Sequence, residues 1–271
     1  MYLKDVAKGR PNVRLVLNDV NHGFAGGNNI GATLARNQIL VFLNSDTRVP
    51  PGSITTLCSL LRKYPEWAML GPVTNQAGNE QKIPVQSNTP DLALEEGSRW
   101  VNHSDGDCFA SNRLDFFCVA TPRKVYLDMG GMDERFGLGY YEDTEFSLRL
   151  LDAGRKMMFT EAVFVYHQAG QSFSTFGKQY LKKLMRKNRR QLKKKLGRKV
   201  VFMHQRDCNL RVLDQYIRNK RERSNVRQRH HLEYRFAGRI HFGQTLYPKH
   251  TLKKLIYYFQ LRHRKRLWNR I

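Results

Sequence analysis

We expect an α/β fold with a mixed, mostly parallel sheet flanked by helices, followed by a basic α-helical tail, from two observations on these 271 residues. Short apolar runs of strand length alternate with segments of helical spacing through residues 1–175, the pattern of a sheet covered by helices. The charge then changes: residues 178–271 hold 30 Lys and Arg against 4 Asp and Glu, whereas residues 1–177 sum to −2. The sequence therefore predicts a domain at 1–175 and a tail at 176–271.

The first half of the domain predicts two strands and two helices. A short apolar run with two valines at 13–17 favours a strand, and residues 18–27 favour a turn-rich loop that leads into a helix at 28–37. The continuous apolar run at 39–43 is typical of a strand buried on both faces of a sheet. Prolines at 50 and 51 favour the start of a helix. The apolar residues that follow at helical spacing support it: Leu57, Leu60, Leu61 and Tyr64.

The second half continues the alternation after a long polar stretch. Residues 74–107 are rich in Asn, Gly, Pro and Ser, and we expect them to be mostly irregular. The remaining expected elements are strands at 68–70, 114–120 and 157–167, a helix after Pro122 that ends at Gly130 and Gly131, and a helix at 144–153. Ligands of such sheets bind at the carboxyl ends of the strands, so we look for the chemistry there.

The composition excludes several classes of protein. No apolar run reaches the roughly 18–20 residues that span a bilayer. The first ten residues lack the apolar segment of a secretory signal, so none is expected. The four cysteines lie far apart and form no CxxC pair, which argues against a zinc ribbon or a disulfide scaffold. A reducing, cytoplasmic location fits this pattern.

The tail contains two basic amphipathic segments, at 176–196 and 251–268. Lys and Arg surround an apolar face in each segment, so an anionic partner is expected. One interpretation is peripheral binding to the inner face of an anionic membrane. The alternatives are that the apolar faces pack on the domain, or that the tail binds nucleic acid, for which we see no RRM or KH signature.

Four clusters in the domain carry candidate chemistry. Asn44 and Asp46 directly follow the buried strand, where a carboxylate could hold a hard divalent cation and its diphosphate, or could simply cap the turn. Glu142 and Asp143 stand at the start of a helix, where acids suit the helix dipole but one can also serve as a general base. His167 ends the last strand, as a metal ligand or as an ordinary hydrogen-bonded residue.

The fourth cluster is a glycine-rich segment at 23–31 between a strand and a helix. Glycines there let a ligand approach the backbone. The segment is neither a P-loop nor a GxGxxG motif, so alone it is a weak signal.

The order of these clusters resembles family 2 glycosyltransferases. Residues 21–31 read NHGFAGGNNIG, similar to the N-x-G-F-A-x-G-x-N-x-G signature of that family, and 42–47 read FLNSDT, similar to its FLNPDT form of the DxD motif. Residues 130–136 resemble GGFDERF, 142–149 resemble EDxDxxxR, and 165–172 resemble the terminal V-x-H-x-x-G-x-S, which ends at Ser172. The resemblance covers about residues 12–173. Its DxD segment is similar to the form that is commonest in rhamnosyltransferase-like members of the family.

This resemblance implies a GT-A fold and an inverting transfer of a sugar from a nucleoside diphosphate to an acceptor hydroxyl. Carried onto this chain, Asp46 and His167 would hold Mg²⁺ or Mn²⁺. Asp143 would be the general base, with Glu142 as the alternative. The implied donor-side residues are Gly26, Gly27, Asn28, Asn44 and Arg123. The implied partners are a UDP-, dTDP- or GDP-linked sugar and a glycan or lipid-linked acceptor.

One departure from the family pattern opens an alternative. Family members begin with strands that bind the base and ribose, and this sequence has no counterpart of them, so the resemblance implies a domain that lacks its first strands. The alternative function is therefore a catalytically inactive glycosyltransferase-like fragment whose basic tail binds an anionic membrane or nucleic acid.

Overall fold

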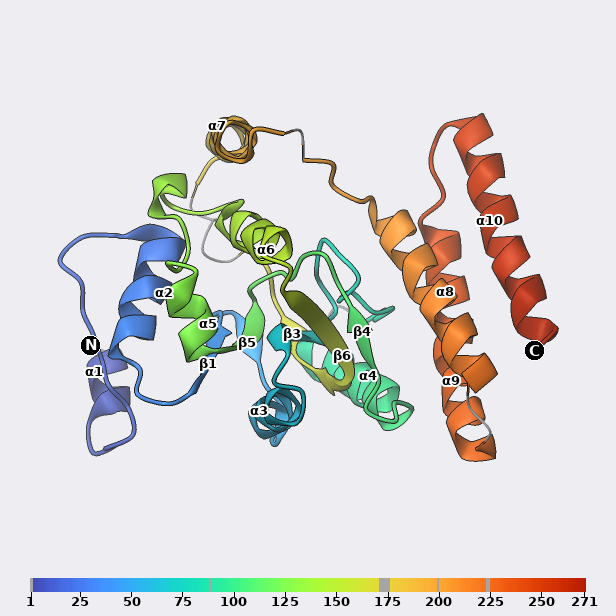
Figure 1. Cartoon of the computed structure of the whole chain (residues 1–271), viewed down its shortest axis with the longest axis horizontal. Helices are drawn as coiled ribbons and strands as arrows, with labels where there is room; N and C mark the ends of the chain where they lie inside the picture. Colours follow the sequence, from blue (N-terminus) through green and yellow to red (C-terminus); the bar gives the residue numbers. More distant parts are fainter. Residues whose placement is uncertain (1, 88, 171–175, 199, 223–224) are drawn as a thin grey trace.

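A five-stranded sheet forms the centre of the computed structural model, which describes every residue except 1, 88, 171–175, 199 and 223–224 (Figure 1). Its strand order is β1-β5-β3-β6-β4. The strands are β1 (Ile39–Leu43), β3 (Trp67–Val73), β4 (Cys108–Ala110), β5 (Cys118–Pro122) and β6 (Lys156–Phe164).

The sheet is mixed. β3 and β6 pair in parallel, and the pairs β1–β5, β5–β3 and β4–β6 are antiparallel. The expected α/β class, a mixed sheet flanked by helices with a helical tail, is confirmed. Among the described strands the parallel pair is β3–β6, and the sheet is mixed because β5 inserts between β1 and β3 in the reverse direction. An apolar run buried on both faces looks the same in either direction, so its sequence does not reveal this.

Helices cover both faces of the sheet. On one face α3 (Ser53–Lys63) buries Leu57 and Leu61 against β3 and β5, as the helical spacing predicted. On the other face α5 (Arg123–Asp128) and α6 (Glu142–Asp152) bury Tyr126 and Phe146 in the larger core cluster. The carboxyl end of β1 and the first turn of α6 are thereby fixed to one rigid scaffold.

Four expectations for the domain differ from the structure. Residues 13–17 form no strand, and α2 (Gly23–Leu34) begins within the expected loop. The stretch at 74–107 contains α4 (Pro90–Asn102), and β5 begins at Cys118 instead of residue 114. Proline occupies the first position of α4, where its missing N–H costs nothing, so a residue that suggested a loop in fact starts a helix.

The tail is entirely helical in its described elements. These are α7 (Lys178–Leu196), α8 (Gln205–Glu222), α9 (Val226–Thr245) and α10 (Thr251–Asn269). α8, α9 and α10 pack on one another beside β4 and α4, whereas α7 lies apart from them, over the start of α6 (Figure 1). In the described part of the chain, none of the helices combines the length and the apolar character that crossing a membrane requires.

A buried ionic network fastens α9 to the sheet. Arg235 donates to Glu161 of β6 and to Asp107, and Arg239 donates to Glu161 at 3.2 Å. Tyr216 of α8 donates its hydroxyl to the same Glu161 carboxylate. Burial raises the pKa of Glu161, but the two guanidiniums outweigh that effect and hold it below its ordinary value. Two cations therefore meet two carboxylates inside the molecule, with the charges balanced.

Candidate active site

The first polar centre of the site is formed by Asp46 and His167. A short two-stranded ribbon brings them together: β2 (Thr47–Arg48) pairs antiparallel with β7 (Tyr166–His167), and Thr47 lies opposite His167. The Gln168 N–H donates to the Asp46 carbonyl at 2.9 Å, which closes the ribbon. The His167 Nε2 atom lies 3.4 Å from the Asp46 Oδ1 atom, and both side chains are largely shielded from solvent.

The surroundings of His167 define which of its nitrogens is free. Its Nδ1 atom lies 3.2 Å from the Gln76 carbonyl oxygen, which can only accept, so a hydrogen bond at this contact requires the proton on Nδ1. In the neutral ring Nε2 then presents a lone pair toward the Asp46 carboxylate. Neighbouring ligands of a cation with bonds of about 2.1 Å stand about 3 Å apart, so this pair fits a shared divalent ion.

Described side chains alone would give such an ion only part of its coordination. No group of three or more His, Cys, Asp or Glu residues is placed to hold a metal in the described ranges. One carboxylate with water and substrate phosphate oxygens is the usual arrangement for Mg²⁺. The donor set therefore fits a cation that arrives with a diphosphate.

The second polar centre is the start of α6. Tyr140 and Tyr141 both have left-handed backbone conformations, with φ of 72° and 81°, and they turn the chain into the helix. Non-glycine residues rarely adopt this conformation, and two in succession require external support. The Asn188 side chain of α7 supplies it, because its Nδ2 donates to the carbonyls of Phe136, Gly139 and Tyr140.

The two carboxylates at this turn have perturbed acidities. Burial raises the pKa of Glu142 well above its usual range, and the neighbouring Asp143 raises it further. Burial likewise raises the pKa of Asp143, the negative charge of Asp115 adds to the rise, and Arg113 opposes it. A carboxylate shifted in this direction is a better proton acceptor near neutral pH than an exposed one.

The segment after β3 links the two centres. Asn75 exchanges two hydrogen bonds with the backbone of His167, at 2.8 and 3.0 Å. A few residues later, the Gly78 N–H donates to Asp115 at 2.6 Å, and Asn79 donates to the same carboxylate at 3.2 Å. Arg113 completes this end through an ion pair with Asp115 at 3.3 Å. One continuous polar segment therefore touches the Asp46–His167 pair and the surroundings of Asp143.

Sequence reasoning missed Asn75, Arg113 and Asp115. The only available signal was the polar composition of the stretch at 74–107, which pointed to function without naming a residue.

The third acid of the α6 motif has a structural role. Glu145 is fully buried and holds Arg149 through two bonds, at 2.7 and 2.9 Å. Arg149 also donates to the Gly131 carbonyl at 2.6 Å, and Lys195 of α7 joins Glu145 at 2.7 Å. Asp133 binds the same lysine, and its hydrogen bonds to Arg135 hold its pKa far below the ordinary value.

Packing accounts for much of the glycine-rich segment. Gly26 is buried, and a Cβ there would lie 2.7 Å from His22 and 3.4 Å from Glu134. Gly27 faces open space, and the Asn28 amide donates to the Phe24 carbonyl one turn earlier. Residues 23–31 therefore fit α2 closely against η1 (Glu134–Phe136), with Gly27 on the accessible side. The donor-side roles of Gly26, Gly27 and Asn28 stay predictions.

The two other expected donor-side residues lie at different ends of β1. The Asn44 N–H donates to the Phe117 carbonyl at 2.9 Å, which sets the turn toward Asp46. The Arg123 guanidinium donates to the carbonyls of Ala32 and Thr33, both at 3.3 Å, at the C-terminus of α2. A cation at that position complements the helix dipole. Ser172 of the last motif falls outside the described residues.

A family model described as glycosyltransferase like family 2 matches residues 3–193. The match covers more than two thirds of the sequence and includes both polar centres. The chain belongs to this family. A comparison with curated proteins finds no match.

Among solved structures, one that the chain resembles is described as GalNAc-T7 with UDP, GalNAc and Mn²⁺. The identity is 16% and the TM-score 0.47, over 61% of this chain and 34% of that one. The chain thus spans about a third of the length of that protein, and we draw no argument from a likeness of this degree.

Proposed function

We propose that this family member is an inverting glycosyltransferase of GT-A type that moves a sugar from a nucleoside diphosphate to an acceptor hydroxyl. The observation that carries the proposal is the polar segment at 75–79, which touches both the Asp46–His167 pair and the Asp115 carboxylate beside Asp143. A diphosphate site and a proton acceptor on one framework are what a single displacement requires.

On the donor side, Asp46 and His167 would hold Mg²⁺ or Mn²⁺. When bound, such an ion neutralises the negative charge that develops on the leaving diphosphate. His167 is held in place for this by its Nδ1–H bond to the Gln76 carbonyl and by stacking on Phe117, with ring centroids 5.3 Å apart. Gly26, Gly27, Asn28, Asn44 and Arg123 are the proposed donor-side residues, for a UDP-, dTDP- or GDP-linked hexose or rhamnose.

On the acceptor side, Asp143 would take the proton of the attacking hydroxyl. The acceptor oxygen bonds to the anomeric carbon from the face opposite the diphosphate, the bond to the diphosphate breaks, and the configuration inverts. The Thr144 N–H and hydroxyl donate to the Asp143 Oδ1 atom and fix its orientation. Glu142 is the alternative base. A glycan or lipid-linked saccharide at the cytoplasmic face of a membrane is the proposed acceptor.

Calorimetric titration with UDP, dTDP and GDP, each with and without Mn²⁺, tests the donor site. We expect metal-dependent binding of one nucleotide and its loss in Asp46→Ala. Asp128→Ala is the matched control, because Asp128 pairs only with Lys124 on the surface of α5 among the described contacts. Equal binding by Asp46→Ala and the control would contradict the assignment of Asp46.

A second candidate is a non-catalytic binding protein with a glycosyltransferase-like body. The observation favouring it is that β1, which leads to Asp46, is an edge strand, and Leu43 at its end is exposed. The same titration decides between the candidates, because a body without donor function would bind none of the three nucleotides in either metal condition.

A further inference from the structure

One face of α10 is apolar and turned to solvent. Its residues follow the spacing i, i+3, i+4, i+7 and are between 50% and 61% exposed: Leu252, Leu255, Ile256 and Phe259. We call these four residues the α10 stripe. The opposite side of the helix is already used, since Tyr257, Leu261 and Trp268 are buried against α8 and α9. The stripe is therefore not what attaches α10 to the protein.

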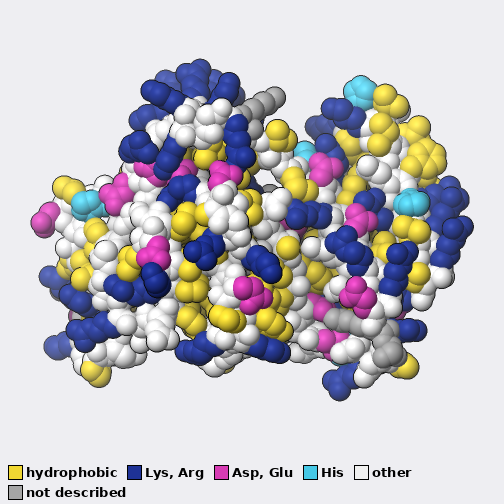
Figure 2. All heavy atoms as spheres, in the orientation of Figure 1, with side chains coloured by type: hydrophobic (Ala, Val, Ile, Leu, Met, Phe, Trp, Pro, Cys, Tyr) yellow, Lys and Arg dark blue, Asp and Glu magenta, His cyan; other side chains and the backbone are white. Residues whose placement is uncertain are grey.

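Cations surround the α10 stripe. Residues 249–271 contain eight Lys and Arg and no Asp or Glu; Lys253 flanks the stripe, and the Lys254 Nζ atom lies over the Tyr247 ring at the same end of the helix, 5.9 Å from its centroid. Yellow apolar atoms and dark blue cationic atoms meet on the same projecting end of α10 in Figure 2. An exposed apolar stripe bordered by Lys and Arg is a pattern of membrane-binding helices.

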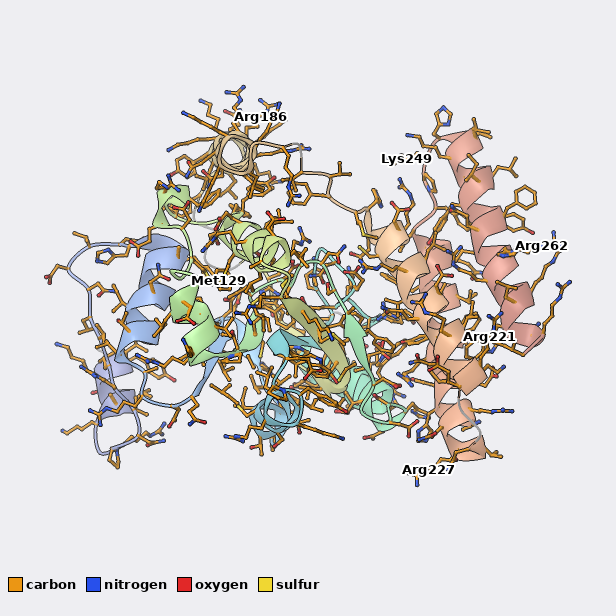
Figure 3. The ribbon with its side chains drawn as sticks, viewed as in Figure 1. Met129, Arg186, Arg221, Arg227, Lys249 and Arg262 are labelled. Carbon is orange, nitrogen blue, oxygen red and sulfur yellow. The ribbon has the colours of Figure 1, made fainter. Side chains whose placement is uncertain are left out.

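A second cationic element lies at the same edge of the molecule. α7 carries ten Lys and Arg and no acid, and Arg186 projects outward from it. α7 and the first turns of α10, next to Lys249, occupy the same side of the view, whereas Arg227 marks the opposite side (Figures 1 and 3). α10 runs away from this edge in Figure 1, so a flat anionic surface laid along the edge would meet α7 and the first turns of α10, which carry the stripe.

We propose that this edge docks on an anionic lipid bilayer, with the α10 stripe inserted among the acyl chains and α7 resting on the headgroups. A second copy of the chain is a poor occupant, because two such cationic edges repel each other. Nucleic acid would satisfy the cations but leave the stripe exposed. Only a lipid surface offers both negative charge and an apolar layer, and each nearby cation strengthens such binding about fivefold.

This docking would turn the acceptor side of the proposed active site toward the membrane. A surface cavity of about 380 Å³ lies between Tyr141, the residue before Glu142, and α7. Lys178, Lys182, Arg186 and Arg189 line it, so it suits a phosphate-bearing group. The docking itself does not depend on sugar transfer. The placing of a lipid-linked acceptor here rests on the proposed function.

Vesicle co-sedimentation of the full chain tests the docking. The probe is phosphatidylcholine vesicles that contain phosphatidylglycerol as the anionic lipid, compared with phosphatidylcholine alone. We expect the triple substitution Leu255→Ser, Ile256→Ser, Phe259→Ser to weaken binding at least tenfold while the melting curve is unchanged, because all three side chains are exposed. The matched control is Leu92→Ser with Val226→Ser, which removes exposed apolar side chains from α4 and α9. Equal binding by the triple variant and the control would overturn the proposal.

A fluorescence experiment tests insertion directly. Trp67, Trp100 and Trp268 are buried, so Phe259→Trp adds one exposed reporter. Brominated acyl chains should quench this reporter and leave the buried tryptophans unaffected. Binding without quenching, or preference for an oligonucleotide over the vesicles that survives the triple substitution, would show a purely electrostatic surface and refute insertion.

A pair of charge-reversal substitutions tests the contribution of the cations separately from that of the stripe. Lys253→Glu with Lys254→Glu should weaken vesicle binding by more than tenfold. Lys4→Glu with Lys8→Glu makes the same change in net charge on exposed residues at the N-terminal end and should have a much smaller effect. Equal losses would mean that only total charge matters and would overturn the assigned edge. Nucleotide titration of the same variants shows whether the donor site is intact.

Discussion

Burial and two neighbours of opposite charge set the acidity of Asp143. Burial raises its pKa most, Asp115 raises it further, and Arg113 lowers it. A base must be deprotonated to act, so activity should fall as the pH drops through this raised pKa, at a higher pH than for an ordinary aspartate. The pH at which kcat/KM falls on the acidic side therefore reports the pKa of Asp143.

Substitution of the two neighbours should move this limb in opposite directions. Asp115→Asn removes a like charge, so the anionic form of Asp143 becomes easier to reach and the limb moves to lower pH. Arg113→Gln removes an opposite charge and moves the limb to higher pH. We expect shifts of about half a unit to one unit each, typical of a nearby charge. The measurement is the pH dependence of sugar transfer, and shifts of the same sign would contradict Asp143 as the base.

At this scale, the residues that belong to recognisable motifs were the predictable ones. The sequence placed Asp46, His167 and Asp143 at strand and helix ends, and the structure brings Asp46 and His167 together. Their residue types suited the chemistry, so they stood out. Asn75 and Asp115 were not predictable, because their proximity depends on how the polar segment after β3 folds back across the sheet.

Among the elements, α9 depends most on buried charge. Arg235 is fully buried between Glu161 and Asp107. Arg235→Met keeps the volume but leaves two carboxylates without their main partner, and we expect a loss of about 3–5 kcal/mol in the free energy of unfolding. Arg227→Met on the exposed start of the same helix is the control and should change it by less than about 0.5 kcal/mol. Urea denaturation measures both, and similar losses would show that the network adds nothing.

The elements that followed a strict pattern were predicted well. β1 spans the apolar run at 39–43, and α3 buries Leu57 and Leu61 on the face that the helical spacing indicated. The exceptions have local causes. Residues 13–17 contain two valines and two leucines but pair with no strand among the described residues, and a strand needs a neighbour to form ladder hydrogen bonds. α4 contains a proline, a serine and a glycine, and Gly97 is required because a Cβ there would meet the Phe164 ring at 2.2 Å.

At the scale of the whole molecule, the tail and the domain share one core. Tyr216, Phe236 and Trp268 belong to the same buried cluster as Phe42 and Phe159 of the sheet. We therefore expect a single cooperative unfolding transition for the whole chain. Trp67→Phe and Trp268→Phe leave reporters in different places, and both variants should give curves whose midpoints coincide with those from circular dichroism. Two separated midpoints would show that the tail unfolds independently.

Charge composition alone predicted the tail but not its attachment. The net charge of +26 on residues 178–271 shows where the surface becomes strongly basic. The hydrophobic core does not end there, because it continues through α8 and α9. The division at 175 and 176 stays a prediction about domains. The buried arginines were indistinguishable in the sequence from the exposed ones around them, because their burial depends on carboxylates more than 70 residues away.

The bond pattern of Asn188 also bears on how such tails can be exchanged between relatives. Because this one side chain of α7 holds the left-handed turn ahead of Glu142, a chimera joined at residue 176 would exchange a residue that supports this turn together with the tail. A breakpoint after Leu196 keeps the host's own asparagine and turn together. A foreign α8–α10 unit grafted beyond that point would have to bring counterparts of Tyr216, Arg235 and Arg239, because these side chains bind the buried Glu161 of the sheet.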